Sequence, residues 1–275
     1  MPKRLFTTLR SSCTNLDTFV HVGGMIEQHH LGLLQGLQKL VLRAETSCKA
    51  LVTAFETNAE TLRELSLAAL VIPDIPVPIL AQLTHLDIHS NLAPNLLANI
   101  FTEATRLCSL AVRATPDVFL HPVVIEAVSH MVNKYDVRRT LEHLRLVGIP
   151  AAADELFALW LDHCYPNLRR ACVLGDSSEA LPNVSRILGG AKTLRALGIT
   201  CGAVAADMQG AFAIPSSVET LYLAGHNTSS VRGSSCSCII TLTHGLVSHS
   251  WYSLNPCQTC APFSSTTSRF HFLRQ

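Results

Sequence analysis

Two histidines and an aspartate between residues 85 and 89 have a spacing that could support metal chemistry. His85, Asp87 and His89 alternate with apolar residues, and alternate residues of a β-strand point to the same side. Two imidazoles on one face can hold a metal ion, with the carboxylate as a third ligand or as a group that orients a histidine. The alternative is a solvated polar strand face. We favour this alternative and expect no metal and no cofactor here.

Four cysteines near the carboxyl end form a second candidate metal site. They are arranged as CxC followed by CxxC, at Cys236, Cys238, Cys257 and Cys260. Paired thiolates at such spacings can chelate zinc tetrahedrally. The surrounding sequence lacks the glycine turn and the hydrophobic packing of a zinc ribbon. Free thiols are therefore the favoured interpretation, and zinc is the alternative.

Motifs for covalent catalysis or phosphate binding are not found in the sequence. A catalytic cysteine or serine needs a base fixed beside it, and 13 His and 10 Cys make accidental pairs expected. There is no P-loop and no GxGxxG, and Gly189-Gly190 has neither a strand before it nor a phosphate-binding lysine after it. The sequence therefore predicts a protein that is not an enzyme, with a metal-dependent hydrolase kept as the alternative.

A short repeated phrase organises the chain: an apolar residue, another three positions later, and another five positions later. The starting residues are Leu37, Leu62, Leu83, Leu107, Leu141, Leu168, Leu194 and Val218. A weaker ninth copy begins at Leu16, where the last position is His21. The second and third apolar residues lie two apart, on one face of a short strand. Stacked copies of such a strand form a parallel sheet that buries this face.

The segments between the phrases have helical periodicity. Apolar residues spaced three or four apart occur in residues 50–55, 96–101, 124–132 and 156–160, and Asp154-Glu155 suit an acidic first helical turn. An ordinary helical bundle is the alternative, but it does not explain why each helix is followed by the same strand phrase. We expect an α/β solenoid, with the parallel sheet on its concave face and helices on its convex face.

With these phrases, residues 16–226 resemble leucine-rich-repeat proteins, and the ragged repeat length is most similar to fungal F-box/leucine-rich-repeat proteins. The eighth position after each start, often Asn or Cys in that family, is Asn only at Asn91. The F-box itself is not visible. Residues 181–188 resemble the start of an F-box, but they lie between two repeats, where a repeat helix is expected. The resemblance implies target binding on the concave surface.

The concave strand positions are the best candidate binding surface. Five of them are basic and two are acidic, giving +3 where the whole chain has a formal charge of +1. Arg113, Arg145 and Arg170, on consecutive repeats, are expected to form a basic row. Arginine forks suit carboxylates and phosphates. The predicted partner-binding residues are Lys39, Arg43, His85, Asp87, His89, Arg113, Arg145, Arg170 and Tyr222.

Composition narrows the class and the compartment. Hydrophobic residues make up 48% and charged residues 15%, so a disordered chain is excluded. Aromatic residues make up only 6%, so we expect an aliphatic core and little stacking on nucleic acid. The amino terminus has no apolar stretch typical of a secretory signal, and no apolar run is long enough for a membrane span. We expect a cytoplasmic or nuclear protein without a membrane partner.

The periodic pattern ends near residue 230. We expect residues 1–230 to form the repeat domain and residues 231–275 to be an irregular, poorly ordered tail rich in Ser and Cys, in which Ile239–Leu242 could add one strand. The favoured function is a non-catalytic scaffold that binds an acidic or phosphorylated protein partner. The alternatives are a substrate receptor of an SCF-type ubiquitin ligase, with the adaptor bound only through an F-box outside this chain, and a metal-binding protein or hydrolase.

Overall fold

The parallel strands predicted from the repeats form one continuous sheet in a computed structural model of the protein. The structure describes residues 15–24, 31–43, 46–68, 72–90, 92–134, 140–164, 166–175, 181–200, 215, 217–226, 235–243 and 246–253. Within these ranges the sheet follows chain order from β1 to β11. Strands β1 to β9 pair in parallel. The chain is therefore an α/β protein with a parallel sheet of nine strands.

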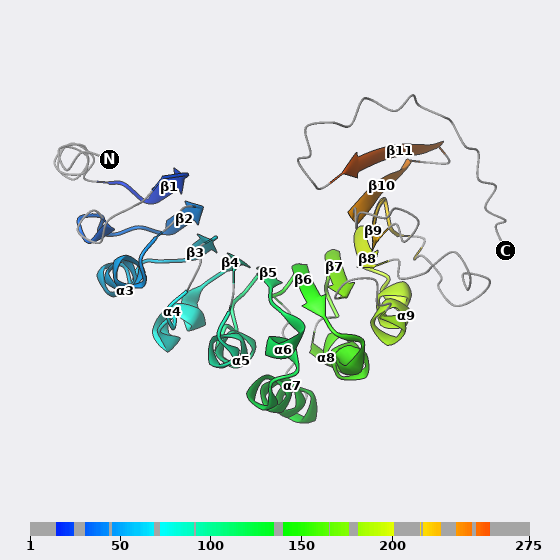
Figure 1. The fold of residues 1–275 in the computed structure, drawn as a ribbon, viewed down its shortest axis with the longest axis horizontal. Coiled ribbons are helices and arrows are strands. Elements are labelled where there is room, and N and C mark those ends of the chain that lie inside the picture. Colours follow the sequence, from blue (N-terminus) through cyan, green and yellow to red (C-terminus); the bar gives the residue numbers. More distant parts are fainter. Residues whose placement is uncertain are drawn as a thin grey trace.

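The strands line the inner side of an arc, and the helices lie on its outer side (Figure 1). The strands are β1 (Thr18–Val22), β2 (Lys39–Arg43), β3 (Glu64–Leu67), β4 (His85–His89), β5 (Ser109–Arg113), β6 (His143–Ile149), β7 (Arg170–Gly175), β8 (Ala196–Thr200) and β9 (Thr220–His226). The helices are α3 (Cys48–Thr57), α4 (Val77–Gln82), α5 (Pro94–Glu103), α6 (Pro116–Phe119), α7 (Pro122–Lys134), α8 (Asp154–Cys164) and α9 (Pro182–Gly190), with a 3₁₀ turn η1 (Ala151–Ala153). The predicted helices near residues 50, 96, 124 and 156 are confirmed as α3, α5, α7 and α8.

The repeat phrase sets the register of the sheet. The second residue of one phrase pairs in register with the second residue of the next phrase, and the third with the third. Leu65, for example, pairs with Leu40 on one side and with Leu86 on the other. All eight starting residues are buried, each 5% exposed or less. The weak ninth copy also forms a strand, and Phe19 and His21 of β1 pair with Leu40 and Leu42. The prediction of which strand face is buried against the helices is thus confirmed from β2 to β8.

Aromatic side chains form part of the core, which the sequence analysis expected to be aliphatic. Phe101 of α5, Phe119 of α6, and Phe157 and Trp160 of α8 pack edge to face, with ring centroids 5.0 to 6.0 Å apart. They lie beside the longest repeat, from Leu107 to Leu141, which contains two helices instead of one. A wider interior at that repeat needs larger side chains to reach close packing.

Hydrogen bonds between repeats use threonine and asparagine side chains. Thr61, Thr140 and Thr193 each precede a starting residue, and each donates its hydroxyl to the carbonyl of the preceding starting residue, at 2.8 to 3.0 Å. Asn58, 1% exposed, accepts from Leu37 N at 2.8 Å and donates to Leu34 O at 3.0 Å. These contacts satisfy backbone groups between neighbouring repeats.

The structure corrects the expectation of an irregular tail. Residues 235–253 contain two strands, β10 (Ser235–Thr243) and β11 (Leu246–Ser253). β10 pairs antiparallel with β9 and with β11. Only Ile239–Leu242 carried a strand signal, because pairing with an edge strand depends on backbone groups that no hydrophobic pattern records. The rest of the tail lies outside the described residues.

Candidate functional site

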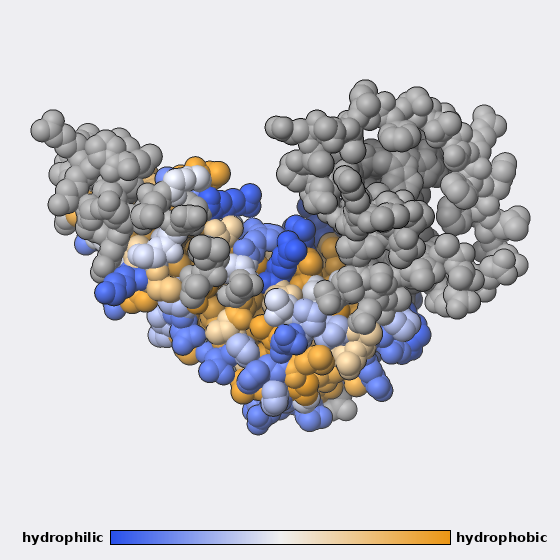
Figure 2. All heavy atoms as spheres, viewed as in Figure 1, coloured by the Kyte–Doolittle hydropathy of each residue, from blue (hydrophilic) through white to orange (hydrophobic). Residues whose placement is uncertain are grey.

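The exposed side chains of the strands form three rows across the concave face. In-register pairing places His143, Arg170 and Ala196 in a first row, and Arg145, Cys172 and Gly198 in a second row further along the strands. A third row contains His89 and Arg113. Hydrophilic side chains gather on the inner side of the arc above the middle of the sheet (Figure 2). The predicted partner-binding residues all lie in these rows.

Charges on the amino-terminal half of this face are paired with one another. Lys39 Nζ lies 2.8 Å from Glu64 Oε2, and Arg43 lies 3.6 Å from Asp87 Oδ2. Asp87 also accepts from the Ser66 hydroxyl at 3.1 Å. Arg43 reaches Asp87 across β3, where Ser66 occupies the intervening position. The basic side chains of β2 are therefore largely neutralised by carboxylates of the same surface.

The two histidines of β4 contact different carboxylates. His85 Nδ1 lies 3.9 Å from Glu64 Oε1 and 3.0 Å from the Thr84 hydroxyl, whereas His89 Nε2 lies 2.7 Å from Asp87 Oδ1. Among the described residues there is no group of three or more His, Cys, Asp or Glu that could hold a metal ion. Cys236 and Cys238 belong to β10, whose side chains are not described, and Cys257 and Cys260 lie outside the described residues.

Three arginines on the carboxyl-terminal half have no such partner. Among the described residues, Arg113, Arg145 and Arg170 take part in none of the ion pairs, in contrast to Arg43, Arg169 and Arg195. All three are exposed. Arginine is always charged at neutral pH, so among the described residues these three positive charges of the face are not compensated by a carboxylate.

The expected basic row is wrong in its geometry. Arg145 pairs in register with Ala111 and Cys172, while Arg113 pairs with Val147 and Arg170 pairs with His143. Each arginine is therefore one strand further along the sheet and two residues further back along its strand. The three form a diagonal, with steps of about 4.8 Å across the sheet and about 6.6 Å along the strand. The sequence spacing predicted the shared face but placed the three residues at one level.

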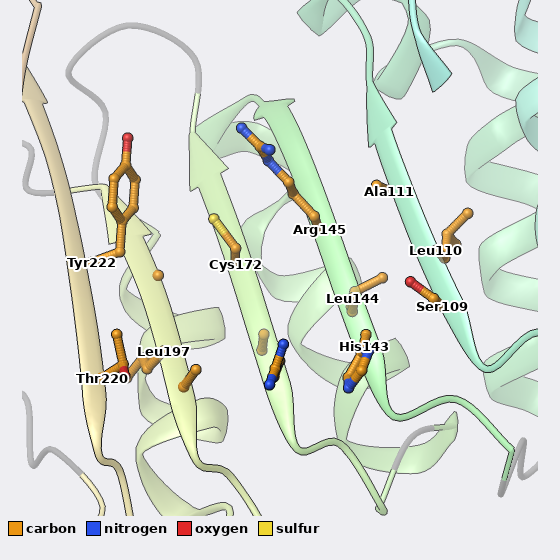
Figure 3. A pocket seen from close by; sticks show the side chains of 14 residues that line it. Ser109, Leu110, Ala111, His143, Leu144, Arg145, Cys172, Leu197, Thr220 and Tyr222 are labelled. Carbon is orange, nitrogen blue, oxygen red and sulfur yellow. The ribbon is translucent and has the colours of Figure 1, made fainter. Parts of the chain in front are cut away.

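A shallow hollow of about 280 Å³ lies beside this diagonal. Small side chains make its floor over β7 and β8, namely Cys172, Ala196 and Gly198, while Arg145 and Tyr222 stand on either side. Figure 3 shows Arg145 leaning from β6 towards Cys172, and Tyr222 rising from β9 on the far side. We name the strip above β8, between Cys172 and Tyr222, the β8 trough.

Gly198 keeps the trough low because no side chain fits there. A Cβ atom at this position would lie 2.6 Å from Cys172 Sγ and 3.2 Å from Cys172 Cα. The Cys172 side chain thus leans over β8 and forms part of the floor. Burial raises the pKa of this thiol, and the nearby Arg145 lowers it by a smaller amount. The thiol is therefore kept protonated at neutral pH, unlike a catalytic thiolate.

His143 is tuned in the opposite sense. Burial and the adjacent Arg170 lower its pKa below the ordinary histidine value, and Glu142 opposes them. Loss of the proton removes a positive charge from the low-dielectric surface next to a permanent cation. At neutral pH the imidazole is consequently neutral and can donate one hydrogen bond without adding charge.

Sequence reasoning identified the walls of the hollow and missed its floor. Arg145, Arg170 and Tyr222 were selected for their chemistry, whereas Ala196 and Gly198 have no functional groups. The signal was the pair of small residues at consecutive exposed positions of β8, between larger residues on β7 and β9. Such a gap is meaningful only once the register is known.

Comparison with known proteins adds no identification. No family model matches the chain, and no curated protein matches its sequence. Among the described residues, no helix is long and apolar enough to cross a membrane. Fold and surface chemistry therefore carry the functional argument.

Proposed function

We propose that this chain is a leucine-rich-repeat solenoid acting as a non-catalytic scaffold in the cytoplasm or nucleus. In this proposal an acidic or phosphorylated segment of a partner protein binds on the concave face. The assignment to the leucine-rich-repeat class is supported by eight in-register repeat phrases, each with a buried starting residue. It is also supported by the strands on the inner side of the arc and the helices on its outer side (Figure 1).

The observation that carries the proposed function is the unpaired charge beside the hollow. Arg145 and Arg170 are exposed and, among the described residues, have no carboxylate partner. Elsewhere on the same face, Glu64 and Asp87 neutralise Lys39 and Arg43. An anionic segment of a partner would supply the missing counter-charge, with charge-assisted hydrogen bonds to the planar guanidinium forks.

Charge reversal on the two faces of the arc tests this proposal. Proteins captured from cell extract by the wild-type chain would be compared with those captured by Arg145→Glu/Arg170→Glu. The matched control is Lys49→Glu/Arg186→Glu, which makes the same charge change at exposed positions of helices α3 and α9. We expect the concave variant to lose specific partners and the helix variant to retain them, with similar melting temperatures for both.

Salt provides an independent measurement on the same partners. Exposed charge contacts are screened within about 8 Å at physiological ionic strength. Wild-type binding should therefore weaken as salt rises from 50 to 500 mM on the order of tenfold or more. Partners that bind the concave variant as well as wild type, and whose binding does not depend on salt, would contradict the proposal and point to an interface elsewhere.

A further inference from the structure

The hollow beside the arginine diagonal combines two features that a simple anion site does not need. One is the pair of guanidinium groups of Arg145 and Arg170. The other is the β8 trough, which has a largely apolar floor of small residues and ends at the ring of Tyr222. Any ligand that uses both features must be anionic at one end and flat and apolar along its length.

Two adjacent arginines match a doubly charged group better than a carboxylate. A single guanidinium fork already satisfies a carboxylate through two parallel hydrogen bonds. A phosphate monoester carries about −1.5 to −2 charges at pH 7 and presents three acceptor oxygens. Arg145 and Arg170 lie one strand and two residues apart, which is within the reach of two long side chains. One phosphate binds between them when the Arg145 side chain turns back towards the row of His143 and Arg170 from the direction drawn in Figure 3.

The β8 trough lies between the backbones of β7 and β9, and the Cys172 side chain covers part of its floor. Cys172 and Tyr222 occupy the same row on β7 and β9, with Gly198 between them. Two strand spacings separate them, about 9.6 Å between backbones. Because Gly198 and Ala196 raise no long side chain, a flat ring can lie above β8. There it would contact the side chain of Tyr222, and aromatic rings pair favourably in offset or edge-to-face arrangements.

We infer that the hollow binds a phosphotyrosine side chain of the partner, with its phosphate between Arg145 and Arg170 and its ring in the β8 trough beside Tyr222. This inference rests on the proposed function and narrows its ligand. A phosphoserine would reach the arginines and leave the β8 trough empty. An unphosphorylated tyrosine would fill the β8 trough and leave both charges unpaired. Only the aromatic phosphate uses the whole hollow.

Three blocked pentapeptides test the inference by titration calorimetry against the full chain. Each has two glycines on either side of a central phosphotyrosine, phosphoserine or tyrosine. We expect the phosphotyrosine peptide to bind about threefold to tenfold more tightly than the phosphoserine peptide, from the aromatic contact. The tyrosine peptide should bind at least about tenfold more weakly than the phosphotyrosine peptide, since it lacks the charge-assisted hydrogen bonds.

Variants separate the two parts of the hollow. Arg145→Gln and Arg170→Gln should each weaken both phosphopeptides about tenfold or more. Ala196→Leu, which fills the β8 trough, and Tyr222→Ala should reduce phosphotyrosine affinity to that of phosphoserine and leave phosphoserine binding unchanged. Arg43→Gln, on the same face but beside Asp87, is the matched control and should leave all three affinities unchanged. Circular dichroism checks that each variant is folded.

Equal affinity for the two phosphopeptides would overturn the inference, as would phosphotyrosine binding that Arg145→Gln and Arg170→Gln leave intact. Either result leaves the wider proposal standing if partner capture still depends on the arginines. Conversely, specific phosphotyrosine binding at the hollow, together with partner capture that is insensitive to charge reversal, would sink the proposed function alone. The peptide and capture experiments therefore fail independently.

Discussion

Single residues on the concave face decide the height of its surface and its charge. Gly198 is required because the Cys172 side chain leans across β8, and the two residues together make a low floor. Arg145 and Arg170 stay uncompensated because none of their in-register neighbours is acidic: these are Ala111, His143, Cys172 and Ala196. The binding chemistry that we propose for this face depends as much on side chains that are small as on those that are charged.

A methyl group at position 198 tests this packing. Gly198→Ala places a Cβ atom 2.6 Å from Cys172 Sγ and 3.0 Å from Cys172 Cβ. We expect a loss of about 1–3 kcal/mol in the free energy of unfolding, measured in urea. The loss should be smaller in a Cys172→Ala background, which removes the closest atom. Equal losses in the two backgrounds would show that the contact with the thiol does not limit the glycine position.

His143 makes the free energy of unfolding depend on pH. Its pKa in the folded protein is lowered from 6.5, first by burial and then by Arg170. Below pH 6.5 the unfolded chain therefore binds more protons than the folded chain, so the free energy of unfolding falls as pH falls. His143→Gln should reduce the slope of stability against pH between about pH 7 and pH 5. An unchanged slope would assign the acid sensitivity to other groups.

At the scale of the elements, helix α8 helps to hold the following helix α9 in place. The carboxylate of Asp154, at the start of α8, accepts hydrogen bonds from the backbone nitrogens of Asn183 at 2.8 Å and Val184 at 2.9 Å. These nitrogens belong to the first turn of α9, where donors have no partner within the helix. Asp154 was expected only to favour the start of its own helix, and it also caps the following one.

Removing this cap should destabilise the carboxyl-terminal repeats. Asp154 is 4% exposed, so Asp154→Ala leaves one buried and one partly buried backbone donor without an acceptor and should cost about 2–4 kcal/mol. Hydrogen exchange should report the loss first at α9 and β8. Glu155→Ala, one residue later on the exposed side of α8, is the matched control and should have little effect. Comparable destabilisation by both substitutions would contradict the capping role.

A charge on the buried face of a strand should propagate to neighbouring repeats. Leu86 of β4 is 1% exposed and pairs with Leu65 and Leu110. Leu86→Asp buries an unpaired carboxylate in a shared core and should cost about 4 kcal/mol or more. Ala111→Asp changes a residue on the exposed concave face of β5, beside Arg145, and should be tolerated. If thermal melts of the two variants coincide, the assigned faces are wrong.

At the scale of the whole molecule, stacking gives the chain a long sheet whose ends need protection. Without a neighbouring strand, β9 would expose a row of unpaired backbone groups, and such edges favour aggregation. The antiparallel pair β10 and β11 continues the sheet beyond β9. Repeat arrays require a terminal element of this kind because each repeat contacts only its neighbours.

Deleting residues 231–275 should therefore act locally. Amides of β9 that bond to β10 should lose protection from hydrogen exchange, while those of β4 to β6, several strands away, should keep it. The shortened chain should also self-associate at lower concentration, as light scattering would show. Undiminished protection in β9 would mean that β10 and β11 do not cap the sheet.

The sequence alone determined the positions of strands β1 to β9, which side of these strands is buried and which is exposed, and the residue types available for binding. A period of two along each strand and a recurring leucine phrase carry that information locally. The sequence also predicted a repeat helix over residues 181–188. The structure has α9 there, with Val184 and Leu188 buried. These features depend on hydrophobic periodicity, which a single chain displays directly.

Tertiary structure decided how those residues meet. The pairing of Arg43 with Asp87 across β3 and the hydrogen bonds of Asp154 to α9 join different repeats, and the pairing of β10 with β9 joins the tail to the last repeat. The register from β2 to β9 follows the repeat phrase even though the repeats differ in length, so the arginine diagonal is already encoded in the distance of each arginine from the start of its phrase. The side-chain contacts between repeats depend on side-chain conformations, which the phrase does not record. The floor of the hollow is defined by absent side chains, so it exists only where taller neighbours stand on both sides.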